Sequence, residues 1–139
     1  MMISTKGRYA LRVMLDLAGH RESGYIPLAE IAARQKISEK YLESILSVLS
    51  KAGMLDALRG KGGGYRLAKA PEDYSVYDIL CLTEGTLAPV TCMKDGESCE
   101  RAGQCPTRPM WEGLDRVITE YLSRWTVADL LKNAQEMQP

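Results

Sequence analysis

One stretch, residues 38–67, constrains the fold of this chain more than any other. It begins with Ser38, whose hydroxyl can accept a hydrogen bond from an unpaired amide in the first turn of a helix. Four apolar side chains then recur at i, i+3, i+4 and i+7: Leu42, Ile45, Leu46 and Leu49. This spacing is typical of a helix with one buried face, and Gly53 suits its left-handed end. We therefore predict a helix over 38–52.

A hairpin with a glycine-rich tip is predicted directly after this helix. Residues 54–58 have the alternation of a strand, and residues 65–67 form the strand that returns. The turn between them contains Arg59, Lys61 and four glycines, so its two cations stand on a backbone with little side chain around them. No Ser or Thr follows the Gly-Lys pair, which argues against a nucleotide-binding loop. Such a tip is suited to lie against a phosphate backbone.

The residues before this stretch predict two more helices. Ser4 or Thr5 can cap the first, in which five apolar residues repeat at helical spacing: Ala10, Val13, Met14, Leu17 and Ala18. Pro27 is placed to open a second, short helix over 28–34. Residues 34–37 leave room only for a turn, so the second and third helices form a helix-turn-helix. With the hairpin, residues 1–70 are predicted to be a winged helix-turn-helix DNA-binding domain, and the fold class is mainly α with a small β-hairpin.

The rest of the chain divides into three parts. In 71–85, Ser75 with Asp78 predicts a capped connector helix that Gly85 stops. Residues 86–109 lack periodicity and hold three cysteines, which indicates a sensor loop. Residues 110–139 are predicted to hold a long dimerisation helix and a last short helix, which Thr126 and Asp129 cap and which frays from 133.

The long helix carries large apolar residues at alternating intervals of three and four: Trp111, Leu114, Ile118, Tyr121 and Trp125. A repeat of 3.5 residues is the seam of a coiled coil. So short a seam, rich in aromatic residues, would be poorly covered in water, and we expect it to pack against a second copy in a homodimer.

Charge is distributed unevenly along the 139 residues. Residues 1–70 contain 12 Lys and Arg against 6 Asp and Glu, whereas residues 71–139 contain 6 against 12. A basic first half beside an acidic second half predicts that the first meets a polyanion. No apolar run approaches a membrane span and no signal-peptide pattern opens the chain, so we expect a cytoplasmic protein without a membrane partner.

Double-stranded DNA is the polyanion that a helix-turn-helix predicts, and seven residues are candidates to contact it: Ser38, Lys40, Tyr41, Glu43, Ser44, Arg59 and Lys61. The first turns of a recognition helix enter the major groove. There Glu43 would repel phosphates but accept from a cytosine amino group. Arg59 and Lys61 should reach the minor groove or its phosphates. The alternative is that these are ordinary solvated charges.

Cys92, Cys99 and Cys105 form the spacing C-x6-C-x5-C. Three thiolates suit an iron-sulfur cluster or zinc, each of which normally takes four ligands. The fourth ligand is open, and five sources are considered: Asp95, Glu97, Glu100, a residue of a partner chain, and His20, the one histidine. The alternative is three free thiols, and Cys81 is interpreted as a small core residue. With one histidine and no convergent acid-base cluster, an enzyme is not expected.

Taken together, these segments resemble the Rrf-type winged-helix transcriptional regulators, a family that includes IscR, NsrR and CymR. The resemblance rests on the opening residues 4–12, the segment 37–43, the tip 59–65 and the cysteine loop. It implies a homodimeric repressor or activator of a partly palindromic DNA site, and it places six residues at DNA-contacting positions: Ser38, Lys40, Tyr41, Glu43, Ser44 and Arg59.

The resemblance also implies an iron-sulfur cluster, 2Fe-2S or 4Fe-4S, on the three cysteines. Cluster-binding members such as IscR complete it with a histidine three residues after the last cysteine, where this chain has Arg108. Other members use an acidic residue of the partner's first helix, and Arg8 stands at the matching position. The first cysteine interval is one residue longer than in IscR. Two hypotheses follow: a regulator that senses cluster, redox or nitric oxide status, and a metal-free regulator controlled by a partner protein, a small molecule or thiol oxidation.

Overall fold

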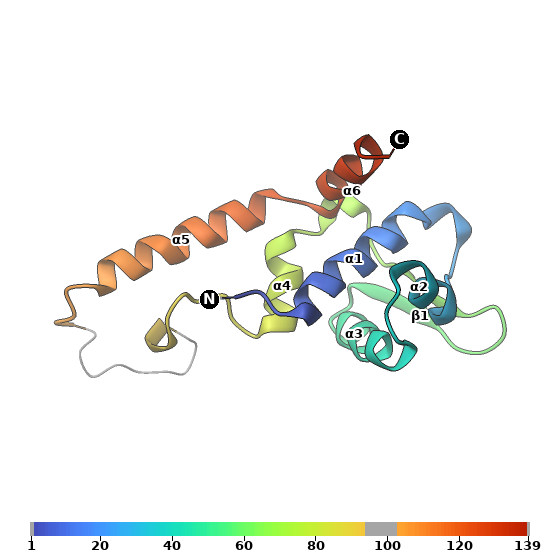
Figure 1. Ribbon diagram of the computed structural model, residues 1–139, viewed down its shortest axis with the longest axis horizontal. Helices are drawn as coiled ribbons and strands as arrows, with labels where there is room; N and C mark the ends of the chain where they lie inside the picture. The colour runs from blue at the N-terminus through green and yellow to red at the C-terminus, as the bar shows by residue number, and fades with distance from the viewer. Residues whose placement is uncertain (1, 94–102, 139) are drawn as a thin grey trace.

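The computed structural model describes residues 2–93 and 103–138. Its helices and strands follow in the order α1 (Thr5–Gly19), α2 (Leu28–Gln35), α3 (Glu39–Lys51), β1 (Leu55–Leu58), β2 (Gly64–Leu67), α4 (Val76–Glu84), α5 (Arg108–Arg124) and α6 (Val127–Glu136). Short 3-10 turns lie at Arg21–Ser23, Pro71–Asp73 and Thr91–Met93. Figure 1 shows α1, α2, α3 and the hairpin gathered at one end, while α5 extends away from them as an arm. Among the described residues, no helix is long and apolar enough to cross a bilayer.

The apolar faces of α1, α2 and α3 meet in the main core. Eight residues of these three helices are fully buried in it, at 0% exposure: Ala10, Val13, Met14, Ile31, Leu42, Ile45, Leu46 and Leu49. The sequence-based stripe of α3 is therefore confirmed. Ser4 caps α1 by accepting from the Gly7 amide at 3.1 Å. Its own amide and hydroxyl both donate to the Glu84 carboxylate, which ties the start of α1 to the end of α4.

The helix-turn-helix is tighter than predicted, because α2 continues to Gln35 and Arg34 lies inside the helix rather than in a turn. Lys36 then takes a left-handed conformation with φ 55°, which reverses the chain within one residue. Ile37 is buried, and Ser38 caps α3 by accepting from the Tyr41 amide at 3.2 Å. The predicted cap of the recognition helix is confirmed.

The hairpin pairs β1 with β2 in antiparallel register, from Leu55 opposite Leu67 to Leu58 opposite Gly64. Tyr65 also exchanges two backbone hydrogen bonds with Ile26, at 2.8 and 2.9 Å, so the segment before α2 lies along β2. A side chain at Gly64 would collide with the Ile26 carbonyl, which explains why glycine stands there. The predicted strands are confirmed, each to within one residue.

Tyr74 joins the hairpin to the C-terminal part of the chain. Its hydroxyl donates to the Met54 carbonyl at 2.7 Å and accepts from the Lys69 amide at 2.8 Å, which closes the base of the hairpin. Its backbone carbonyl accepts from the Val127 amide at the start of α6, at 3.0 Å. One buried residue therefore contacts both ends of the hairpin and the junction between α5 and α6.

The apolar residues of α5 face in two directions. Ile118, Leu122 and Trp125 pack against a second core cluster built on α4 and Leu87, whereas four others are exposed: Met110, Leu114, Val117 and Tyr121. The predicted seam is thus divided between an internal contact and an open face. The helix also begins at Arg108, two residues before the predicted boundary, because proline is well accommodated in a first turn. The Thr126–Asp129 capping box is confirmed, and α6 continues to Glu136 rather than fraying from 133.

Candidate nucleic-acid interface

The N-terminal half of α3 presents an exposed polar face. All five residues predicted on it have exposed side chains: Ser38, Lys40, Tyr41, Glu43 and Ser44. The Ser44 hydroxyl donates to the Tyr41 carbonyl at 2.7 Å, and the Ser38 hydroxyl serves as the cap, so both retain only part of their hydrogen-bonding capacity. Lys40 and Glu43 form no ion pair among the described residues, so their charges are available to an external partner.

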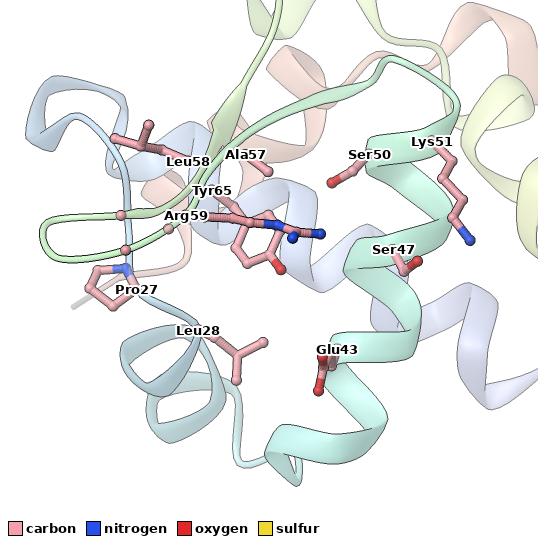
Figure 2. A pocket seen from close by; sticks show the side chains of 13 residues that line it. Pro27, Leu28, Glu43, Ser47, Ser50, Lys51, Ala57, Leu58, Arg59 and Tyr65 are labelled. Carbon is pink, nitrogen blue, oxygen red and sulfur yellow. The ribbon is translucent and has the colours of Figure 1, made fainter.

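A groove of about 510 Å³, here called the wing groove, separates α3 from the hairpin. The α3 side is formed by Glu43, Ser47, Ser50 and Lys51, and the hairpin side by residues that include Arg59 and Tyr65. Figure 2 shows the Arg59 side chain running from the hairpin into this groove toward α3. The structure thus brings Arg59 and Glu43 to one groove, while Lys61 stays exposed at the tip outside it.

Three polar residues on the α3 side of the wing groove were not among the predicted contacts: Ser47, Ser50 and Lys51. The Ser50 hydroxyl is buried and, in the part of the chain that the structure describes, has no hydrogen-bond partner. These residues lie four, seven and eight positions after Glu43, so the helical period alone would have placed them on its side of the helix. The general rule that a recognition helix enters the major groove with its first turns does not extend to these positions.

The cations around α3 differ in whether their charge is compensated. Arg66, on the outer side of the hairpin, lies 3.5 Å from the Asp56 carboxylate and 4.3 Å from the centre of the Tyr25 ring. Within residues 2–93 and 103–138, neither Arg59 nor Lys61 forms an ion pair. On the hairpin, the charge that can act on an external anion is therefore that of Arg59 and Lys61.

An ion pair between the buried Asp16 carboxylate and the partly exposed Arg34 holds the turn that precedes α3. The Asp16 carboxylate accepts from the Arg34 guanidinium at 2.7 and 2.9 Å and from the Gln35 amide at 2.9 Å. Burial raises the pKa of Asp16, but the hydrogen bonds from Arg34 and Gln35 outweigh it, so the pKa lies below its usual value. Asp16 therefore stays ionised, and it fixes the end of α2 against α1.

Three of the four cysteines lie, in the sequence, between α4 and α5, and Cys81 lies within α4. Cys92 and Cys105 are both partly buried, and Cys99 lies outside the described residues, as do Asp95, Glu97 and Glu100. The Cys105 thiol lies 3.2 Å from the Thr107 hydroxyl, which lowers the pKa of that thiol. Cys81 is half-buried against the second core cluster, where burial raises the pKa of its thiol, as suits its interpretation as a core residue.

The possible fourth ligands are held elsewhere. His20 hydrogen-bonds through Nδ1 with the Asp16 carbonyl at 2.7 Å, at the C-terminal end of α1. Arg108 lies 3.0 Å from the Glu112 carboxylate, on the first turn of α5. Among the residues that the structure describes, no three His, Cys, Asp or Glu side chains come close enough to hold a metal ion. Three thiolates remain a donor set suited to a cluster, and the described residues supply two of them.

Comparison with known proteins identifies the type of regulator. The profile of the Rrf2 family, described as an iron-dependent transcriptional regulator, matches residues 3–133. Protein rrf2 of Nitratidesulfovibrio vulgaris is 38% identical over 96% of this chain and 89% of its own length. The HTH-type transcriptional regulator IscR of Erwinia tasmaniensis is 37% identical over 97% of this chain and 81% of its own length.

Two solved structures share the fold along nearly the whole chain. IscR of T. potens has a TM-score of 0.79 and 37% identity, and covers 100% of this chain and 92% of that one. CymR of B. subtilis, titled the global cysteine regulator, has a TM-score of 0.78 and 35% identity, and covers 96% and 98%. The proteins named here are transcriptional regulators rather than enzymes, and their winged-helix fold is the one described above. This chain belongs to the Rrf2 family of DNA-binding transcriptional regulators.

Proposed function

We propose that this regulator reads double-stranded DNA with the N-terminal half of α3 in the major groove and the hairpin against the minor groove or its phosphates. The observation that supports this most is the wing groove, in which Arg59 of the hairpin reaches toward α3 across a space of about 510 Å³. A phosphate strand runs between the major and minor grooves of a duplex, and the groove offers it an uncompensated cation.

The proposed contacts divide into two classes. Lys40, Tyr41 and Glu43, with the Ser38 and Ser44 hydroxyls, lie where base edges would be met. Arg59 and Lys61 supply charge to phosphates and carry no base information. Glu43 reduces affinity for the backbone and, through a cytosine amino group, increases selectivity.

The test compares binding to random duplex DNA with the sequences that the protein selects from a random pool. Arg59→Ala and Lys61→Ala should weaken both kinds of binding equally and lower the salt slope by about one unit per contact. Tyr41→Phe and Glu43→Gln should change which sequences are selected. Arg66→Ala is the matched control, because its charge is already paired with Asp56 on the same hairpin. If both groups of variants act alike on random and selected DNA, the division of roles is wrong.

For regulation, we propose that Cys92, Cys99 and Cys105 would hold an iron-sulfur cluster, 2Fe-2S or 4Fe-4S, with a fourth ligand from outside this set. When bound, the cluster would supply sensitivity to iron, oxidants or nitric oxide. The chain's own contribution is positional: α5 begins three residues after Cys105, so a rearrangement of the cysteine loop acts on the first turn of the arm. The IscR relatives support this proposal, and Arg108 in place of the expected histidine leaves the fourth ligand open.

Anaerobic purification followed by visible spectroscopy and iron and sulfide analysis tests the cluster. Brown protein with near-stoichiometric iron and sulfide, lost in Cys92→Ala and kept in Cys81→Ala, would support it. Colourless protein that still binds DNA would support the second proposal, control through a thiol, a partner protein or a small molecule. The lowered pKa of the Cys105 thiol and the likeness to CymR favour that alternative.

We further propose that α5 makes the regulator a homodimer in the cytoplasm. Four apolar side chains on one face of the arm are between 41% and 61% exposed: Met110, Leu114, Val117 and Tyr121. Their spacing of four, three and four residues is that of a helix-helix seam, and a second copy would cover it with the same face. In this proposal, residues 1–70 bind DNA and residues 71–85 connect that domain to the rest of the chain. Residues 86–109 form the sensor loop, and residues 110–139 hold the helix that forms the dimer.

A further inference from the structure

The first turns of α1 carry side chains that the contacts proposed above leave unused. Thr5, Arg8, Tyr9 and Arg12 are spaced i, i+3, i+4 and i+7, so they lie on one face of the helix. The other face is the core side, which includes Ala10, Val13 and Met14. Thr5, Arg8 and Arg12 are exposed and Tyr9 is half-buried. These four residues are called the α1 stripe below.

The α1 stripe adjoins the beginning of α3. The rings of Tyr9 and Tyr41 meet edge to face, with centroids 5.9 Å apart and planes at 89°. A hollow of about 430 Å³ lies at this contact, lined by Thr5, Tyr9, Lys36, Ile37, Ser38 and Tyr41. Figure 1 shows the start of α1 beside α3. The stripe therefore continues the surface that is proposed to meet the major groove.

Both arginines of the α1 stripe are held in place before any ligand binds. The Arg12 guanidinium lies 5.0 Å from the Tyr9 ring centre, and it donates to the Gln35 side chain at 3.1 Å and to the Gln35 carbonyl. Arg8 donates to the Thr5 hydroxyl at 3.1 Å. Groups that are ordered in advance lose less conformational entropy on binding, so more of their electrostatic attraction contributes to the affinity.

The charge of this surface is positive and uncompensated. Arg8, Arg12 and Lys36 have no ion pair in the described portions of the chain. Asp16, the acid on α1, is already bound by Arg34. Two other acids lie on adjoining elements: Glu39 on the first turn of α3, and Glu84 of α4, whose carboxylate accepts from Ser4.

The α1 stripe and the wing groove lie on different sides of α3. Tyr41 faces the stripe and Glu43 faces the groove, and residues two apart stand on nearly opposite sides of a helix. A helix in the major groove, which is about 12 Å wide, has a phosphate strand on each side. The hairpin accounts for one of the two strands.

We propose that the α1 stripe, with Lys36, is a phosphate-binding surface for the DNA strand on the side of α3 away from the hairpin. Arg8, Arg12 and Lys36 supply charge, and the hydroxyls of Thr5 and Tyr9 donate to phosphate oxygens. This inference rests on the proposed DNA binding and adds a contact that orients α3 without reading bases. It also gives the opening residues 4–12 a function.

The experiment measures binding of the full chain to random-sequence duplex DNA over a salt series. Arg8→Gln should lower the salt slope by about 0.9, so the affinity lost between 50 and 200 mM salt shrinks about threefold. Tyr9→Phe keeps the ring on Tyr41 and should weaken binding about two- to tenfold with the slope unchanged. Arg21→Gln is the matched control, since it removes the same charge at the other end of α1, about 20 Å away.

Each outcome decides between named alternatives. Equal slopes for Arg8→Gln and Arg21→Gln, in protein that still responds to Arg59→Ala, would overturn the phosphate surface and leave the proposed function intact. A changed sequence preference in Arg8→Gln would also overturn it, because the stripe would then read bases. A wild-type chain that binds no duplex DNA would refute the proposed function itself, and the inference with it.

Discussion

The two ends of this molecule differ in how completely their apolar side chains are buried. In α3, Leu42, Ile45, Leu46 and Leu49 are fully covered by the chain's own helices. In α5, no described residue is fully buried, and the side facing away from α4 carries large apolar groups in contact with water. The core at the end proposed to bind DNA is complete within a single chain, whereas the arm has an apolar face that only another surface can cover.

The charge follows the same division. The basic residues gather in 1–70, next to the surface proposed for DNA, and the acidic excess lies in 71–139. The arm α5 itself has no net charge, with three Arg against three Asp and Glu, so the acidic excess lies in the residues that flank it. The following variants break or sharpen this comparison.

Leu46→Ala should have the largest effect, because its side chain is fully buried between the helices of the main core. We expect a loss of about 4 kcal/mol in the free energy of unfolding, measured by urea denaturation. Leu114→Ala, the same substitution at a side chain that is 41% exposed, should cost under about 1 kcal/mol in dilute protein. Equal losses at the two positions would remove the contrast between the two ends.

Val117→Glu tests the open face of α5, where this side chain is 61% exposed. A two-fold interface would contain the new charge twice, so we expect the dimer to be weakened by about 3 kcal/mol. Light scattering over a dilution series measures the change in dissociation constant, and the exposed Glu120→Gln is the control on the same helix. A wild-type chain that is monomeric at every concentration would contradict the dimer.

Asp16→Asn should destabilise the fold by about 2 kcal/mol, since it weakens two charge-assisted hydrogen bonds from Arg34 to the contact between α1 and α2. The pKa of Asp16 is lowered in the folded state, so its contribution is present above the unfolded pKa of about 4 and is lost as pH falls through the folded value. Urea denaturation at neutral and at acidic pH should show that wild type and variant converge in acid. A gap that persists in acid would assign the loss to packing.

Tyr74→Phe should have a smaller effect than Asp16→Asn, about 1 kcal/mol, because it removes one hydroxyl and keeps the ring. The hydrogen bonds that it removes belong to the hairpin base, while the backbone bond to Val127 remains. Hydrogen exchange should therefore show faster opening near Met54 and Lys69 and no change in α6. Faster exchange in α6 as well would mean that the hydroxyl supports both ends of the molecule.

The accuracy of the sequence-based predictions follows this same contrast. The α3 stripe, the Ser38 and Thr126 caps and the left-handed Gly53 depend on neighbours within a few residues, and each is confirmed. The seam of α5 was correctly identified as apolar, but the period of a pattern does not tell which surface covers it. Ile118 and Trp125 are covered by α4, a helix distant in sequence.

The candidate site shows the same limit. The exposed residues at the start of α3 could be predicted, because a helix-turn-helix fixes their place. The wing groove and the Tyr9–Tyr41 contact could not, since both depend on how separate elements pack. The spacing of Thr5, Arg8, Tyr9 and Arg12 was visible in the sequence, yet it gained a meaning only once α1 was seen beside α3.

Lys36 shows that the turn before α3 is not built for stability alone. Its φ of 55° is a conformation that glycine adopts freely and that a residue with a side chain adopts at a cost of about 1 kcal/mol. Glycine would make a more stable turn but would remove a cation from the hollow beside Tyr41. Folding and the proposed phosphate contact thus favour different residues at this position. A Lys36→Gly protein should have a higher free energy of unfolding and a lower affinity for DNA.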